Sequence, residues 1–468
     1  MFGAPSKFGL DGTAPAADNA GPMSSSTRRV IHPSRAVALL FLLLIALGTF
    51  LLRLPLAQAQ GEAAPWLTAL FTAASAVCVT GLVVVDTGSY WSGFGQFVIM
   101  ALFQLGGFGL MTAAALLGLM VNRSMRLRSR LMTQAETHSV ALGDVRSIAR
   151  VVLVVTLVCE TSLAAMLAVR LHAGHGLSWP DAIWSGVFHA ISAFNNAGFS
   201  LHGDSLMRYA GDGWVLVPVM LGIVIGGIGF PVMQDLRVRL RDPRHWSLHT
   251  KLTLYGSAVL LVLGAGSILV FEWTNAQTLG PMALGEKLMS AVFASVSART
   301  AGFNSIDTGA LTQESLALHY LLMFIGGGSA GTAGGVKVTT AAILLLLVVA
   351  EIRGRPDSEA FGRRVCVAAQ RQAITVLVLG SVLVVVGTLV LLRVTDLPTD
   401  RVIFEVISAF GTVGLSTGIT ADLPPVGQIT LIVLMYAGRV GMITLATSLA
   451  LGERKMPWRY PEEHPIVG

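Results

Sequence analysis

Four short segments of the chain repeat a pattern of glycines and small residues whose backbone could bind a cation through carbonyl oxygens. They read FTAASAVCVTGL (71–82), FHAISAFNNAGF (188–199), FASVSARTAGF (293–303) and FEVISAFGTVGL (404–415). The recurring glycine of each segment permits backbone angles that a side chain forbids. Rings of carbonyl oxygens can replace the hydration shell of a potassium ion. These segments therefore indicate a cation site made of backbone oxygens.

We predict that the residues around these glycines form the selectivity filter of a pore. The predicted ion-binding residues are Cys78, Val79, Thr80, Gly81, Asn195, Asn196, Ala197, Gly198, Thr300, Ala301, Gly302, Gly411, Thr412, Val413 and Gly414. None is a carboxylate, which argues against a calcium or sodium channel with an acidic ring. Arg299 opens the third loop, and we expect it to brace that loop against Glu286 or Glu405. A direct role in ion exclusion is the alternative.

A second motif follows each loop at a similar distance. It reads LGGFG (105–109), IGGIG (225–229), IGGGS (325–329) and AGRVG (437–441). Two linked motifs that recur four times in register indicate an internal repeat. Glycine pairs in membrane helices are also often close-packing contacts, so packing remains an alternative role for this second motif.

The composition indicates that the repeats lie in a membrane. Of the 468 residues, 53% are hydrophobic and 12% are charged, whereas soluble domains carry about 25% charged residues. Apolar runs such as 151–169 and 252–271 approach or reach the roughly 20 residues that cross a bilayer as a helix. The segments 65–77 and 180–194 are too short to span and are expected to be re-entrant half-helices.

The predicted fold is an all-α integral membrane protein with four helix–pore-loop–helix repeats. It has eight transmembrane helices and four pore half-helices around a pseudo-fourfold central pore. The predicted boundaries are a disordered cytoplasmic N-terminal tail at 1–35, repeats at 36–121, 147–239, 250–350 and 368–452, and a cytoplasmic C-terminal tail at 453–468.

The placement of charge orients the predicted helices. Lysines and arginines gather in alternate loops and in both tails, which puts both termini in the cytoplasm by the positive-inside rule. The net charge of +6 therefore does not indicate nucleic acid. The opposite face carries acidic residues such as Asp86, Asp204 and Asp212, which would concentrate cations at the pore mouth. Ordinary solvated loops are the other interpretation of these residues.

The third repeat contains a run of glycines where a helix is expected. Six glycines lie between 326 and 335, and such a run should unwind the inner helix at 326–337. The competing interpretation is a phosphate-binding loop, but the Gly-Lys-Ser/Thr order that it requires is absent. Arg439 stands where the other repeats have glycine, and we expect it to pair with carbonyls of the unwound segment, or else to form a static salt bridge. The predicted gate residues are Gly326, Gly327, Gly328, Ser329, Gly331, Thr332, Gly334, Gly335, Lys337 and Arg439.

The remaining polar residues indicate no enzyme. Catalytic groups do not cluster at one depth, and Cys78, Cys159 and Cys366 have neither disulfide nor zinc spacing. Glu160 lies inside an apolar run, and we expect it to pair with a helix neighbour. The alternative function is a secondary transporter of another small cation or solute, although such transporters usually have two inverted halves.

The motifs SARTAGFNS (297–305) and GGGSAGTAGGVKV (326–338) resemble those of the potassium-transporter superfamily that contains the KtrB and TrkH subunits. The resemblance covers residues 36–455 and is nearer to the shorter KtrB type. It implies potassium uptake across the bacterial cytoplasmic (inner) membrane, with potassium as the transported ion and no organic cofactor. It also implies a homodimer in membrane lipid and a cytoplasmic nucleotide-binding regulatory ring of the KtrA type. Sodium dependence occurs in the family and stays open here.

Overall fold

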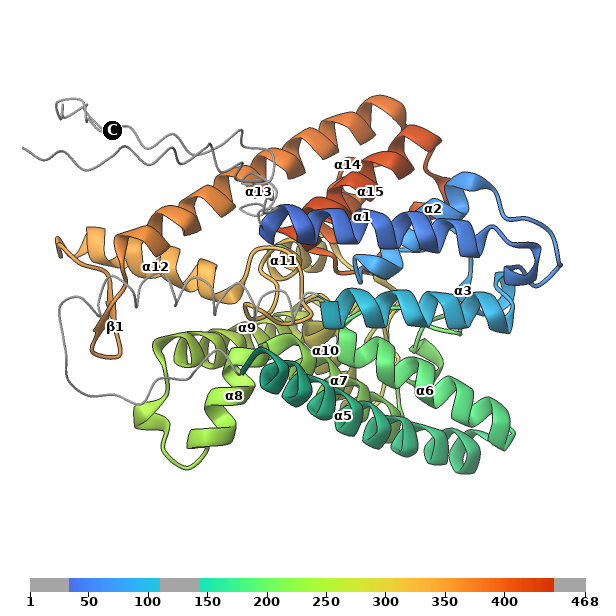
Figure 1. Cartoon of the computed structure of the whole chain (residues 1–468), viewed down its shortest axis with the longest axis horizontal. Helices are drawn as coiled ribbons and strands as arrows, with labels where there is room; N and C mark the ends of the chain where they lie inside the picture. Colours follow the sequence, from blue (N-terminus) through green and yellow to red (C-terminus); the bar gives the residue numbers. More distant parts are fainter. Residues whose placement is uncertain (1–32, 110–143, 442–468) are drawn as a thin grey trace, which may run out of the picture.

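The computed structural model describes residues 33–109 and 144–441, and within these ranges the chain is mainly helical (Figure 1). The helices are α1 (Pro33–Leu52), α2 (Trp66–Val77), α3 (Thr87–Tyr90), α5 (Asp144–His175), α6 (Trp179–Asn195), α7 (Gly213–Ile228), α8 (Phe230–Arg239), α9 (Leu248–Glu272), α10 (Leu284–Ser297), α11 (Gln313–Phe324), α12 (Val338–Ile352), α13 (Val367–Val394), α14 (Thr399–Gly411) and α15 (Pro425–Val440). A further helix covers Gly93–Gly109. Two short strands, β1 (Glu359–Ala360) and β2 (Arg363–Arg364), form an antiparallel hairpin.

Some predicted segments lie outside the described residues. These are residues 1–32 of the N-terminal tail, residues 110–121 of the first repeat, residues 442–452 of the fourth repeat and the C-terminal tail at 453–468.

Three of the described helices are long and apolar enough to cross a membrane. They are Arg150–His175 within α5, Leu248–Glu272 and Val367–Val394. Helices α7 and α8 pass the same test as a pair, although they meet at 96°. Gly229 between them has a φ of 91° and a ψ of 149°, angles that interrupt the helix and that glycine adopts readily. The count of eight spanning helices remains a prediction, since the helices that end at Gly109 and Val440 adjoin residues outside the description.

The helices pack in a cyclic order. Each short helix packs on the long helix before it: α2 on α1, α6 on α5, α10 on α9 and α14 on α13. The helices that follow the loops pack on the next short helix along, since α7 contacts α10, α11 contacts α14 and α15 contacts α2. Figure 1 shows α13 along one side of this bundle and α5 along the opposite side.

The short helices begin and end for local reasons. The Ser178 side chain accepts a hydrogen bond from the Asp181 backbone N–H at the start of α6, where Pro180 suits the first turn. At the other end the chain enters the left-handed region, with φ values of 57° at Asn196 and 48° at Thr412. This reversal stops each helix and directs the chain into the following loop.

The glycine pairs of the second motif allow helices to approach the ends of the short helices. A β carbon at Gly226 would lie 1.8 Å from the Phe194 carbonyl oxygen, and one at Gly438 would lie 1.8 Å from that of Phe410. Gly106 stands in the same relation to the end of α2, at 2.1 Å. Close packing is therefore one role of these glycines.

We expect Gly226→Ala to destabilise the protein, because the new methyl group would overlap a backbone oxygen that cannot rotate away. The loss should be about 1–3 kcal/mol, measured as a lower thermal unfolding midpoint in detergent. Gly266→Ala in α9 is the matched control, since nothing lies within 4 Å of its β position. An equal effect of the two substitutions would contradict the packing role.

Candidate ion pathway and gate

The glycines of the four loops form a closed ring of contacts. A β carbon at each glycine would clash with a carbonyl oxygen of the next loop. The pairs are Gly81 with Ala197 (2.4 Å), Gly198 with Ala301 (2.8 Å), Gly302 with Val413 (2.5 Å) and Gly414 with Thr80 (2.1 Å). The last pair returns to the first loop, so the four loops meet around one axis in chain order.

The loops share one alternation in the sign of the backbone angle φ. In each, the glycine has a positive φ, and so has the residue two positions before it, whereas the residue between them does not. The first residues are Val79, Asn196, Thr300 and Thr412. Alternating backbone angles turn successive peptide N–H groups to one side of the chain. The carbonyl oxygens are then left on the other side, where a cation could contact them.

Serines of the short helices accept hydrogen bonds from the backbone N–H groups of the loops. The N–H of each middle loop residue donates to a serine carbonyl; the pairs are Thr80 with Ser75 (2.8 Å), Ala197 with Ser192 (2.8 Å), Ala301 with Ser297 (2.9 Å) and Val413 with Ser408 (2.8 Å). The Ser75 hydroxyl also accepts from the Gly81 N–H at 3.1 Å, and Ser408 does so from Gly414 at 3.2 Å. The recurring Ser-Ala pair was visible in the sequence, but its bracing role was not predicted.

Three residues predicted for the filter lie at helix ends. Cys78 caps α2, while Asn195 and Gly411 are the last residues of α6 and α14. The Asn195 side chain donates to the Glu160 carboxylate at 3.2 Å and to the Ile191 carbonyl at 2.9 Å. Its side chain therefore holds helices together, and Glu160 has the helix neighbour that was expected.

A cavity of about 230 Å³ opens beside the glycine ring. All four loop glycines line it, together with Asp86 and His202. Burial and nearby Arg208 lower the pKa of His202, and they outweigh Asp204 and Asp86, which raise it. The imidazole is therefore neutral at neutral pH, and Asp86 gives the cavity a negative charge.

Two carboxylates of the acidic mouth predicted from the sequence are held in ion pairs. Asp204 lies 2.7 Å from Arg208. Asp212 lies 2.7 Å from Arg170 and 2.8 Å from His175. Partial burial raises the pKa of Asp212, but the hydrogen bonds from Arg170 and His175 outweigh this, and the pKa is below its usual value. Asp86, in contrast, lines the cavity and is placed to attract a cation.

The glycine run of the third repeat forms an irregular segment beside the ring. Helix α11 ends at Phe324 and α12 begins at Val338, and we call residues 325–337 the intervening segment. Its Gly328 N–H donates to the Gly227 carbonyl at 2.8 Å. A β carbon at Gly334 would lie 1.9 Å from the hydroxyl of Thr412, a predicted filter residue. The segment therefore contacts both α7 and the fourth loop.

Arg439 joins the intervening segment to α15. Arg439 as a residue is 2% exposed. The guanidinium donates to the Thr332 carbonyl of the segment and, at 3.2 Å, to the Gly106 carbonyl. Lys337 points back into the same segment and donates to the Ala333 carbonyl. Arg439 thus forms the predicted contact with a carbonyl of the unwound segment, and its partners are not carboxylates.

The prediction that a carboxylate holds Arg299 is wrong. The Arg299 guanidinium donates to the Ser257 hydroxyl of α9 at 3.0 Å and to the Gly326 carbonyl at 3.3 Å. Glu286 lies in the first turn of α10, at the end of that helix far from Arg299, and accepts from the Ala283 N–H. Glu405 instead accepts from the Thr420 hydroxyl. Arg299 therefore connects the third loop with the start of the intervening segment.

Comparison with known proteins places this architecture in a family. Residues 23–460 match TrkH, a family described as cation transport protein. The chain is 39% identical to Ktr system potassium uptake protein B of Bacillus subtilis, over 93% of this chain and 97% of that protein. It is 36% identical to potassium/sodium uptake protein NtpJ of Enterococcus hirae, over 95% and 99%.

A solved structure has the same fold. The potassium transporter TrkH from Vibrio parahaemolyticus superposes with a TM-score of 0.69 at 17% identity, covering 91% of this chain and 86% of that one. The family resemblance inferred from the loop motifs is thus confirmed, and the chain is a transport protein rather than an enzyme. This chain is a multi-pass membrane protein and belongs to the TrkH family of cation transport proteins.

Proposed function

We propose that the chain takes up potassium ions across the bacterial cytoplasmic membrane through one pore between its four glycine loops. The closed ring, in which each loop glycine contacts a carbonyl of the next loop, supports this most directly. The adjoining cavity would be the outer entrance. Relatives named for potassium uptake, at 39% and 35% identity over 93% of this chain, support the choice of ion.

Electrostatics favour a monovalent cation in such a ring. Helices α2, α6, α10 and α14 all end where the loops begin. The C-terminal end of a helix carries about half a negative charge, so four ends around one axis would stabilise a cation. Carbonyl oxygens would replace its hydration shell, and no carboxylate is needed at the filter.

Sodium is a second candidate ion. NtpJ, at 36% identity, is named for potassium and sodium uptake. The four loops are also unequal, since the first has Val79 and Thr80 where the fourth has Thr412 and Val413. Unequal loops would offer an ion a less regular set of oxygens, which weakens discrimination between potassium and sodium.

The proposed arrangement has four repeats with eight spanning helices and both termini in the cytoplasm. Two chains would form a homodimer with one pore in each. Relatives named as Ktr system components support a cytoplasmic nucleotide-binding regulatory ring of the KtrA type as partner. The transported ion is the only ligand that the proposal requires, and no organic cofactor is included.

In this proposal the intervening segment is the gate, and Arg439 holds it in the closed position. The segment lies against Thr412 and against α7, so it would obstruct the pore just inside the filter. The Arg439 guanidinium binds the Thr332 carbonyl and would hold the segment in this position. Its positive charge would also repel an entering cation.

Replacing Gly414 with serine should weaken the apparent potassium affinity at least about tenfold, the equivalent of ~1.4 kcal/mol. The added side chain would meet the Thr80 carbonyl oxygen and distort the ring. The affinity is measured as the half-saturating concentration for uptake in bacteria that lack other potassium transporters. Gly93→Ser is the control, because its β position is open.

Serine at Gly81, Gly198 or Gly302 should have the same effect if the four loops act as one filter. Potassium affinity that is unaltered in all four variants, each inserted in the membrane, would reject the filter assignment.

Arg439→Ala should raise the maximal uptake rate several-fold, because the segment loses its bond at Thr332 and the pore loses a positive charge. Arg439→Lys keeps the positive charge but cannot donate to both the Thr332 and the Gly106 carbonyls as the guanidinium does. An uptake rate between those of the wild type and Arg439→Ala would indicate that the hydrogen bonds contribute as well as the charge. Arg393→Ala, at an exposed site in the last turn of α13, is the control. If Arg439→Ala leaves both the uptake rate and its regulation unchanged, Arg439 does not hold the gate closed.

A further inference from the structure

The β1–β2 hairpin ends in a turn that carries an unusual residue. Glu359 pairs with Arg364 and Ala360 with Arg363, which leaves Phe361 and Gly362 as the turn. Their φ values are 52° and 70°, a geometry that favours Asn-Gly. A bulky residue with positive φ is rare and costs free energy. The phenylalanine ring therefore needs a reason to occupy the tip.

The ring of Phe361 belongs to an exposed cluster. It stacks on Tyr255 of α9 with 5.4 Å between ring centres. The Lys251 ammonium lies 5.7 Å from the centre of the Phe361 ring. Phe361 and Tyr255 are 51% and 54% exposed. We call Lys251, Tyr255 and Phe361 the basic–aromatic platform.

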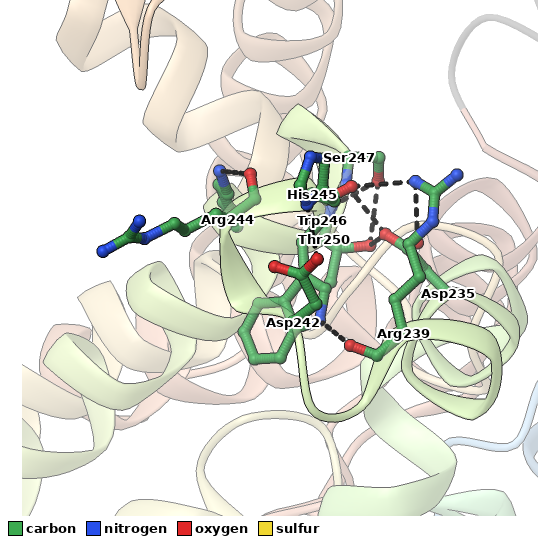
Figure 2. A network of polar contacts seen from close by, with 9 residues as sticks. Asp235, Arg239, Asp242, Arg244, His245, Trp246, Ser247 and Thr250 are labelled. Atoms are coloured by element: carbon green, nitrogen blue, oxygen red, sulfur yellow. Dashed lines mark hydrogen bonds and ion pairs between the residues drawn. The ribbon is translucent and has the colours of Figure 1, made fainter.

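A rigid corner between α8 and α9 supports the platform (Figure 2). The Asp235 carboxylate accepts from the Ser247 N–H at 2.8 Å and from the Thr250 hydroxyl at 2.7 Å. Lys251 donates to the Arg244 carbonyl at 2.9 Å, so the platform is tied to this corner. Figure 2 shows the Arg244 side chain extending away from the network.

The corner is strongly basic. Residues 237–251 contain five lysines or arginines and one aspartate. In the described part of the chain, the side chains of Arg237, Arg241 and Arg244 have no ion pair with a carboxylate. Their charges are therefore available to an anionic partner.

The exposed face of α9 continues from the platform into apolar surface. One face of this helix carries residues spaced three or four apart: Lys251, Tyr255, Val259 and Val262. Val259 and Val262 are 55% and 72% exposed, and α9 is long and apolar enough to cross the membrane. Along this face a charged residue is followed by an aromatic ring and then by aliphatic side chains. The same order is found across one leaflet of a bilayer, from charged headgroup through the interface to the acyl chains.

We propose that the platform binds an anionic phospholipid of the cytoplasmic leaflet. Lys251 and Arg244 would contact the phosphate, the Tyr255 and Phe361 rings would lie at the interface, and an acyl chain would follow Val259 and Val262. Membrane lipid fits better than an acidic protein surface, because the platform is continuous with the apolar face of a spanning helix. This site is separate from the ion pathway and does not depend on which ion is carried.

Lipid counting by native mass spectrometry tests the site. Full-length protein in detergent is titrated with phosphatidylglycerol or phosphatidylcholine. The wild type should retain phosphatidylglycerol in preference, and Lys251→Gln should lower its occupancy about fivefold. Phe361→Asn should also lower occupancy while keeping the hairpin, since asparagine suits the turn.

The chain offers a matched control. Lys287 lies 4.7 Å over the ring of Trp273 near the opposite end of α9, beside Glu286, so Lys287→Gln should leave occupancy unchanged. Equal occupancy in wild type, Lys251→Gln and Phe361→Asn would overturn the proposal, as would equal retention of phosphatidylcholine. Variants that keep the lipid but lose a soluble regulatory protein would assign the platform to that protein and also overturn it.

Discussion

Backbone groups inside a bilayer find no water to bind, and this constraint governs the whole arrangement of loops and helices. Irregular backbone at membrane depth is tolerated only where protein or a wet cavity satisfies it. In the proposed pore, the N–H of each middle loop residue is satisfied by a serine carbonyl of the preceding helix. The loop carbonyls are then free to face an ion. The loops meet in one cycle of close contacts, so none can rearrange without disturbing its neighbours.

The same constraint explains how two buried guanidinium groups are held. Arg299 and Arg439 both donate to carbonyls of the intervening segment, at Gly326 and Thr332. These oxygens are available because the glycine-rich segment is not helical. A buried charge is costly unless it has partners. Here the partners are uncharged carbonyl oxygens, which accept hydrogen bonds but do not cancel the positive charge of either arginine. Movement of the segment would remove carbonyl partners from both arginines, which favours the position seen here.

Much of this arrangement could be predicted from the sequence, because it depends on local conformation. Glycine at the loop positions and the early end of α6 follow from short-range rules. The partner of Arg299 could not be predicted, since sequence spacing does not reveal that α9 brings Ser257 beside the third loop. The role of the loop serines was missed for a related reason. The Ser75 hydroxyl reaches the Gly81 N–H only because the chain reverses at Val79. A β-branched residue does not indicate such a reversal in the sequence, because it rarely adopts a positive φ.

This reversal at Val79 indicates that the ring holds its loops under strain. Val79, Thr300 and Thr412 have φ values of 56°, 79° and 48°, and β-branched residues rarely adopt such angles. Residues in sparsely populated regions cost about 1–3 kcal/mol each and persist only when their surroundings determine them. Asn196, which tolerates this conformation well, makes the second loop the least strained. An isolated loop would relax toward an ordinary turn. The neighbouring loops prevent this relaxation, so carbonyl spacing in the proposed filter would be a property of the ring as a whole.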